Sequence, residues 1–275
     1  LGGSTGHGYI AAGGRRFQVI ASPVIADGTA RGAVMVLLDV TSRQAPEDMR
    51  REFSANVSHE LKTPVTTISG YAEMMMSGMA RRADVPKLSE KIFNEARRLI
   101  ELTDDIIKLS RLDEGSAGSA AAEVDLLAVA RTAAERLEQK ARKFKVSVEV
   151  SGEDVVVLGD EQLVDEMITN LCDNSIKYNR PGGHVFIETG KRGDAPCVTV
   201  SDDGIGIEPE HLGRVFERFY RVDKSRSKET GGTGLGLSIV KHSAAWHRAT
   251  VEAESVPGKG TKISIVFDGK GGELL

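Results

Sequence analysis

The sequence is poor in cysteine and contains no long apolar run. Its two cysteines, Cys172 and Cys197, are too few for a disulfide scaffold or for a structural zinc site built on thiolates. The longest apolar run, residues 33–38, has the length of a strand, whereas crossing a bilayer takes about 20 apolar residues. The chain begins at Leu1 without the basic start and apolar core of a signal peptide. Because it also lacks an initiator Met, we expect a part of a longer protein.

Neither sign of charge is in large excess. The 275 residues include 36 Lys and Arg and 40 Asp and Glu, for a formal net charge of −4. This near-balance argues against a nucleic-acid-binding protein that relies on a strong positive field. Hydrophobic residues make up 40% of the chain, which is enough for a buried core. The length corresponds to about two domains of roughly 100–200 residues each.

Residues 1–42 are rich in glycine and resemble strands. The segments 16–20 and 32–40 predict two strands, with a turn at Asp27 and Gly28 between them. Two strands alone are too few for independent stability. This segment is therefore expected to be the end of a larger sheet domain.

Residues 43–114 predict two long amphipathic helices. Apolar residues recur at steps of three and four between positions 47 and 79, which is the helical period. A second helix begins near Pro86, close to a helix start where proline is tolerated. Each helix has one apolar stripe, so two copies of the hairpin would bury both stripes in a homodimeric four-helix bundle.

Residues 115–122 are rich in Gly, Ala and Ser and predict a linker. Residues 123–268 mix the two periodicities, which predicts an α+β layer with helices on one face of a mixed sheet. Residues 269–275 are expected to form a tail. The helices are expected at 126–143, 161–178 and 235–247, and the strands at 146–150, 155–158, 185–189, 197–201, 250–253 and 263–267.

His59 lies on the polar face of the first predicted helix. At 100° per residue it points away from the apolar Val57 and Leu61. Near neutral pH an imidazole is partly deprotonated and has a lone pair on one ring nitrogen, and the adjacent Glu60 could accept a proton. Pro64 is expected to kink the helix or remove a backbone hydrogen bond. A lone histidine of this kind is usually only a solvent-facing residue, so its interpretation depends on the downstream motifs.

One predicted helix carries two amides and a lysine on a single stripe. Asn170, Asn174 and Lys177 are spaced i, i+4 and i+7. An amide oxygen suits a hard cation and an ammonium group suits phosphate, so the stripe is compatible with Mg²⁺ and a polyphosphate. The plainer interpretation is a polar, solvent-facing stripe.

Two glycine-containing segments follow. Asp202 stands at the end of a predicted strand, and Gly204 and Gly206 after it would allow close approach of a planar ligand. The Asp202 carboxylate could accept a hydrogen bond from an amine of that ligand. The glycines of 231–236 run directly into a helix, where backbone N–H groups attract an anion. Neither a Walker A loop nor a Rossmann fingerprint is present. The charged stretch 222–230 is long enough for a lid over a ligand, or is an ordinary surface loop.

Five motifs together resemble one family. Their order is that of the H, N, G1, F and G2 boxes of two-component sensor histidine kinases, and the resemblance covers roughly residues 45–268. It implies a dimerisation and phosphoacceptor bundle followed by a Bergerat-type ATP-binding domain. Residues 1–42 resemble the closing strands of a PAS sensory domain. The five motifs are residues 59–64, 170–178, 202–206, 216–221 and 232–237.

The resemblance implies roles for individual residues. His59 would accept the γ-phosphoryl group of ATP, Glu60 would be the neighbouring acid or base, and Thr63 matches a threonine associated with dephosphorylating the partner protein. Asn174 would bind Mg²⁺. The residues implied at the nucleotide are Asn170, Asn174, Lys177, Tyr178, Asp202, Gly204, Gly206, Phe216, Arg221, Gly232, Thr233, Gly234, Leu235, Gly236, Leu237 and Thr261.

The resemblance also implies partners. These are a second copy of the chain, paired through residues 43–114, and the receiver domain of a response regulator whose aspartate takes the phosphoryl group. The chain resembles the cytoplasmic portion of phosphate-regulation-type sensor kinases, which are usually anchored in the bacterial membrane by a preceding region. As an isolated piece it is expected to be soluble.

Two alternatives remain open: a dimeric signalling scaffold whose catalytic half binds ATP but transfers poorly, and a simple Bergerat-fold ATPase. Asn170 argues against the ATPase, because ATP-hydrolysing relatives carry a glutamate there and an amide cannot deprotonate water. One departure from the family is Arg248, which stands where relatives usually have glycine. If that position needs a positive φ, an arginine costs about 1 kcal/mol.

Overall fold

The computed structural model describes residues 5–13, 15–26, 29–114, 121–222 and 232–268. The chain divides into two units, Leu1–Lys62 and Thr63–Leu275, which are described separately below. Among the described residues, none of the helices combines the length and the apolar character that crossing a bilayer requires. The predicted turn at Asp27 and Gly28 and the predicted tail 269–275 lie outside the described residues, as does most of the predicted lid 222–230.

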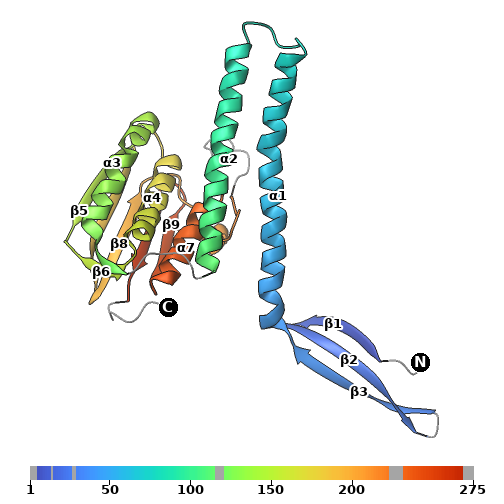
Figure 1. The fold of residues 1–275 in the computed structure, drawn as a ribbon. Helices are drawn as coiled ribbons and strands as arrows, with labels where there is room; N and C mark the ends of the chain where they lie inside the picture. The colour runs from blue at the N-terminus through green and yellow to red at the C-terminus, as the bar shows by residue number, and fades with distance from the viewer. Residues whose placement is uncertain (1–4, 14, 27–28, 115–120, 223–231, 269–275) are drawn as a thin grey trace. The chain divides into compact units, whose positions relative to one another are not determined.

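The first unit contains a three-stranded antiparallel sheet in the order β1-β2-β3 (Figure 1). Its strands are β1 (Gly6–Ala12), β2 (Arg15–Ala26) and β3 (Thr29–Asp39). The two predicted strands are confirmed within β2 and β3, while β1 was not predicted because its Gly- and Ala-rich sequence lacks an alternating pattern. Consecutive residues of β3, from Val34 to Leu38, are all exposed, so within this unit neither face of β3 is buried.

Helix α1 (Thr41–Met76) begins in the first unit and ends in the second, and it runs through Pro64 without interruption. In the second unit it is followed by α2 (Val85–Asp113), which has Pro86 in its first turn as predicted. The backbone N–H of Ala80 donates to Met74 O at 3.0 Å and closes the end of α1. The predicted apolar stripe of α2 is confirmed at its second half, where Leu102 and Leu109 are buried.

The rest of the second unit is an α+β layer, as predicted. A five-stranded mixed sheet has the order β5-β7-β8-β10-β9, in which only β5 and β7 are parallel. Figure 1 shows helices α3, α4 and α7 on one face of this sheet. The strands are β5 (Ser147–Gly152), β7 (His184–Arg192), β8 (Ala195–Asp202), β9 (Thr250–Val256) and β10 (Gly260–Val266); the helices are α3 (Leu126–Phe144), α4 (Glu161–Lys177) and α7 (Gly236–Trp246).

Two short elements, β4 and α5, were not predicted. Strand β4 (Ala122–Asp125) pairs in a two-stranded sheet with β6 (Val156–Gly159), which the sequence predicted at 155–158, and α5 (Pro209–Leu212) follows β8. The predicted linker 115–122 ends in β4, and its other described residue is Ala121. The four residues of β4 show too little alternation to be recognised as a strand. Its pairing partner, β6, lies more than 30 residues away in the sequence, so no local pattern indicates the pairing.

Local sequence explains where the helices begin. Asp125 caps α3 by accepting from Leu127 N at 2.9 Å, and Asp160 caps α4 by accepting from Leu163 N at 2.9 Å. Both helices turn their apolar stripe to the sheet. The core between the layers includes Met167 from α4, Ile187 from β7 and Ile265 from β10, each with no exposed surface. This packing holds the polar stripe of α4 on the opposite side, where the site is formed.

Candidate functional site

A cavity of about 450 Å³ opens beside α4 in the second unit. Of the residues that the sequence predicted at a nucleotide, all but three line it, and the three exceptions are explained by their other contacts. Leu235 is fully buried, and Phe216 packs against the hydrophobic core. Gly204 instead supports the wall, since its N–H donates to Asp202 Oδ1 at 3.0 Å. The predicted residues that line the cavity are Asn170, Asn174, Lys177, Tyr178, Asp202, Gly206, Arg221, Gly232, Thr233, Gly234, Gly236, Leu237 and Thr261.

Asp202, at the end of β8, is held by three hydrogen bonds. Its Oδ1 accepts from the backbone N–H groups of Gly204 and Thr261, at 3.0 and 3.2 Å, and its Oδ2 accepts from Ser175 Oγ at 2.9 Å. Burial raises the pKa of this carboxyl above its ordinary value, although the three hydrogen bonds act in the opposite direction. The result is an oriented acceptor in a partly apolar wall, suited to an amine or N–H edge of a planar ligand.

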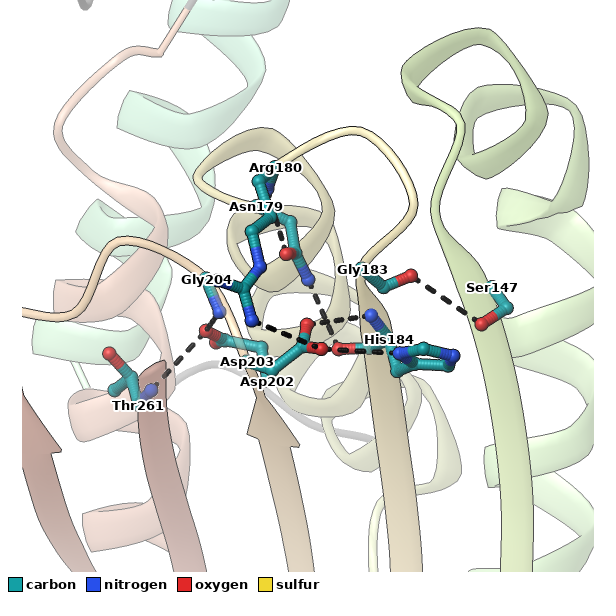
Figure 2. A network of polar contacts seen from close by, with 9 residues as sticks. All are labelled: Ser147, Asn179, Arg180, Gly183, His184, Asp202, Asp203, Gly204 and Thr261. Carbon is teal, nitrogen blue, oxygen red and sulfur yellow. Dashed lines mark hydrogen bonds and ion pairs between the residues drawn. The ribbon is translucent and has the colours of Figure 1, made fainter. Parts of the chain in front are cut away.

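Asp203, the next residue, serves a different purpose. Figure 2 shows its side chain directed to His184, while Asp202 is bonded to Gly204 and Thr261. Asp203 accepts from His184 N at 2.7 Å and contacts His184 Nδ1 at 3.1 Å. Burial alone would raise its pKa, but the hydrogen bonds from His184 and Asn179 lower it overall. Asp203 therefore links the end of β8 to the start of β7 through hydrogen bonds to His184, and it does not line the cavity.

The glycines around the cavity have different requirements. A Cβ on Gly206, whose φ is +68°, would lie 2.2 Å from Val256 O, so a side chain is excluded there. A Cβ on Gly232 would meet nothing closer than Tyr178 Oη at 3.7 Å, which is an ordinary contact. Gly206 is thus required for the backbone path, whereas Gly232 gives open space beside the cavity.

The glycine-rich turn leads into α7, with Gly236 both the first helical residue and part of the cavity wall. Thr233 shapes the turn by accepting from Leu235 N at 3.2 Å, and its hydroxyl donates to Asp105 Oδ2 of α2 at 2.8 Å. Asp105 also lines the cavity. The backbone N–H groups at the start of α7 are the kind of site that binds an anion.

Lys177 is paired with a carboxylate that the sequence analysis did not single out. Its Nζ lies 2.7 Å from Asp173 Oδ2 on the same helix, and Lys140 of α3 bonds to Oδ1 of that carboxylate. The Asp173–Lys177 pair could have been recognised from its i, i+4 spacing. Lys140 could not, because it is 33 residues away from Asp173 in the sequence and reaches it only through the packing of α3 on α4.

The side chains fit a magnesium ion that a polyphosphate brings with it. No group of three or more His, Cys, Asp or Glu that could hold a metal occurs in the described part of the chain, so an all-protein cage is not formed there. Asn170 and Asn174 nevertheless place amide groups in the cavity wall. Mg²⁺ commonly takes one or two protein oxygens and completes its shell with phosphates and water, which this pair can provide.

The three residues predicted for phosphoryl transfer lie on α1. His59 and Glu60 belong to the first unit and Thr63 to the second. The His59 side chain is exposed, and Val57 and Leu61 are less exposed than it is, in agreement with the predicted polar face. Thr63 is also exposed, and its carbonyl accepts a hydrogen bond from Thr67 Oγ1 at 3.0 Å.

Two known families match the sequence, and each covers one of these regions. Residues 159–270, which include the cavity's glycine turn and α4, match the family described as histidine kinase-, DNA gyrase B- and HSP90-like ATPase. Residues 49–115, which include His59, match the His Kinase A phospho-acceptor domain.

Curated relatives match most of the chain. The sensor-like histidine kinase SenX3 of Mycolicibacterium smegmatis is 39% identical over 243 residues, covering 88% of this chain and 63% of the relative. The phosphate regulon sensor protein PhoR of Pseudomonas aeruginosa is 38% identical over 244 residues, covering 86% of this chain and 54% of the relative. The chain thus spans somewhat over half the length of these relatives.

A solved structure shares the fold. The histidine kinase ThkA, in its complex with the response regulator protein TrrA, superposes with a TM-score of 0.63 at 22% identity, covering 97% of this chain and 80% of that one. Given the two family matches and the identity with named sensor kinases, the chain belongs to the two-component sensor histidine kinases.

Proposed function

We propose that this chain transfers the γ-phosphoryl group of ATP to its own His59. The observation that carries the proposal is the cavity, which has an oriented acceptor, Asp202, in the same wall as the amides of α4, a lysine and the glycine turn of α7. An adenine amine would meet Asp202, and the phosphates would meet Lys177 and the first turn of α7.

The cavity favours phosphoryl transfer over simple hydrolysis of ATP. Asn170 is an amide and cannot take a proton from water. The carboxylate that α4 contributes to the cavity wall, Asp173, is bonded to two lysines. Burial would raise the pKa of Asp173, but the charges of Lys177 and Lys140 lower it overall, so this carboxylate is a weak base.

The reaction follows from the chemistry of the imidazole. The lone pair of a neutral His59 ring nitrogen attacks the γ-phosphorus, the bond from that phosphorus to the bridging oxygen breaks, and ADP leaves. Glu60, adjacent in sequence, is the proposed acceptor of the proton that the phosphorylated ring releases. Mg²⁺ bound with ATP would neutralise phosphate charge, with the Asn174 and Asn170 amide oxygens as its protein ligands.

We further propose two partners. Phe93, Ile100 and Ile107 are exposed on α2 at intervals of seven residues, which is the spacing of a helix–helix seam. A second copy of the chain would cover this stripe in a four-helix bundle. A response regulator would then take the phosphoryl group from His59, and Thr63, one helical turn further on, would help to remove it from that regulator. The ThkA structure with a regulator protein supports this type of partner.

The test is incubation of the whole chain with Mg²⁺ and γ-labelled ATP. We expect acid-labile, base-stable label on the wild type and none on His59→Gln or Asn174→Ala. His7→Gln is the matched control, because His7 is an exposed histidine of β1 outside the predicted site, and it should keep the label. ATP binding without label would contradict the kinase and favour the scaffold. Steady phosphate release without label would favour a simple ATPase.

A further inference from the structure

Asp173 lies between two ammonium groups that come from different helices. Lys177, one turn along α4, places Nζ 2.7 Å from Oδ2, and Lys140 of α3 bonds to Oδ1. The side chains of Asp173 and Lys177 are only 19% and 14% exposed, while that of Lys140 is 34% exposed. The three groups form one continuous charge cluster at the junction of α3 and α4.

The cluster faces the cavity unevenly. Asp173 and Lys177 line it, and Lys140 stands behind them on α3, outside the lining. With Lys140 present, the cluster has one positive charge in excess. Without Lys140, Asp173 and Lys177 would form a pair with no net charge, and this pair would attract an anion only weakly.

We propose that Lys140 is a positioning residue for phosphate binding, which keeps Asp173 neutralised so that Lys177 can turn from that carboxylate to the nucleotide. This inference rests on the proposed function, since it specifies how the same cavity receives the phosphates. Lys140 itself touches no substrate and acts through Asp173.

The physical reason is the cost of leaving a half-buried carboxylate without a counterion. Removing one partner from a desolvated ion pair is strongly unfavourable, because the remaining charge is neither hydrated nor paired. If Lys177 moved to a phosphate with no Lys140 present, Asp173 would be left in this state and would also repel the incoming phosphates. The Lys140 bond to Oδ1 removes both penalties while leaving Oδ2 for Lys177 to release.

The electrostatics of the three groups agree with this arrangement. Burial and the neighbouring charge of Lys177 lower the pKa of Lys140, against the pull of Asp173 and of Glu101 on α2. The two lysines therefore repel each other, and Asp173 holds them together. A phosphate that draws Lys177 away would relieve this repulsion.

The test compares how Lys140→Met binds ATP and adenosine, measured by calorimetry on the whole chain. We expect ATP binding to weaken by about tenfold, because the charge-assisted contact between Lys177 and a phosphate is lost when Lys177 stays paired with Asp173. Adenosine, which has no phosphate, should bind unchanged. Lys140→Arg should restore most of the ATP affinity. Lys143→Met is the matched control, because Lys143 is an exposed residue of the same helix, and it should change neither affinity.

A double variant separates this mechanism from simple loss of charge or of structure. In Asp173→Asn, no carboxylate needs a counterion, so adding Lys140→Met should change ATP binding much less than it does in the wild type. Equal losses with and without Asp173, or parallel losses of ATP and adenosine binding, would overturn the inference. Failure of the wild type to bind ATP or adenosine would instead overturn the proposed function itself, and this inference with it.

Discussion

The hydroxyl of Thr233 donates a hydrogen bond of 2.8 Å to Asp105 Oδ2, which joins the glycine-rich turn to helix α2. Burial raises the pKa of Asp105, against the hydrogen bond from Thr233 and the charge of Lys108. The same carboxyl group lines the cavity. A residue of the helical hairpin thus supplies negative charge to the site where the proposed ligand carries its phosphates.

Replacing Asp105 with Asn should strengthen ATP binding. The amide oxygen can still accept from Thr233, so the turn keeps its contact, but the charge that repels phosphate is removed. We expect the dissociation constant of ATP to fall by about threefold at pH 8, a typical effect for one partly screened charge, and that of adenosine to stay unchanged. Asp104→Asn, an exposed neighbour, is the control. Weaker ATP binding by Asp105→Asn would show that the contact itself matters more than the charge.

Two glycines of the cavity should respond differently to alanine. Gly206→Ala places a Cβ 2.2 Å from Val256 O at a φ of +68°, so we expect a loss of about 2 kcal/mol or more in the free energy of unfolding. Gly232→Ala meets only Tyr178 Oη at 3.7 Å and should leave stability unchanged. Urea unfolding of both variants tests this difference, and similar stability of the two would contradict it.

Acid should destabilise the protein through His247. Its Nε2 accepts from Asp160 N at 3.1 Å, so the neutral ring carries its proton on Nδ1 and donates to Ser243 O at 2.7 Å. Burial lowers the pKa of His247 below its ordinary 6.5, against the nearby Asp160 and Ser243 groups. Below about pH 6.5 the unfolded chain therefore binds more protons than the folded one, and stability falls with falling pH.

This loss can be isolated by comparing the wild type with His247→Gln. The half-buried His242 has a lowered pKa as well, mainly because of burial, but it is present in both proteins. We expect the difference in unfolding free energy to shrink by up to about 1.4 kcal/mol per pH unit below pH 6.5. Urea unfolding followed by the fluorescence of Trp246, which packs against His247 with ring centroids 4.7 Å apart, is the measurement. A constant difference from pH 7.5 to 5.5 would contradict the prediction.

Arg248 does adopt a positive φ, of 53°, directly after the C-cap of α7. The condition attached to this departure from the family's glycine is therefore met, and Arg248 occupies a strained position. Arg248→Gly should raise the unfolding free energy by about 1 kcal/mol. Lys145→Gly should have the same sign, because Lys145 caps α3 with a φ of 58°. Lys143→Gly, inside α3, should lower stability by about the same amount; a gain there would show that backbone strain is not the cause.

The long periodic elements were predictable from the sequence. Helices α1, α2, α3 and α4 follow from the helical period of their apolar residues, with Pro86 marking the start of α2, and the alternation in β7 and β8 is local as well. The order of the five motifs identified most of the cavity wall. These features depend on side chains a few residues apart, whose relationship a single helix or strand fixes.

Only the tertiary structure decided which residues meet across the elements. Leu235 is buried and Phe216 packs against the core. Asp202 lines the cavity, whereas the adjacent Asp203 bonds to His184 of β7. Lys140 bonds to Asp173, and Thr233 bonds to Asp105. The last two pairs are 33 and 128 residues apart in the sequence. Local periodicity determines which face of a helix is polar. The packing of helices on the sheet and on each other determines which charged residues of other elements lie next to that face.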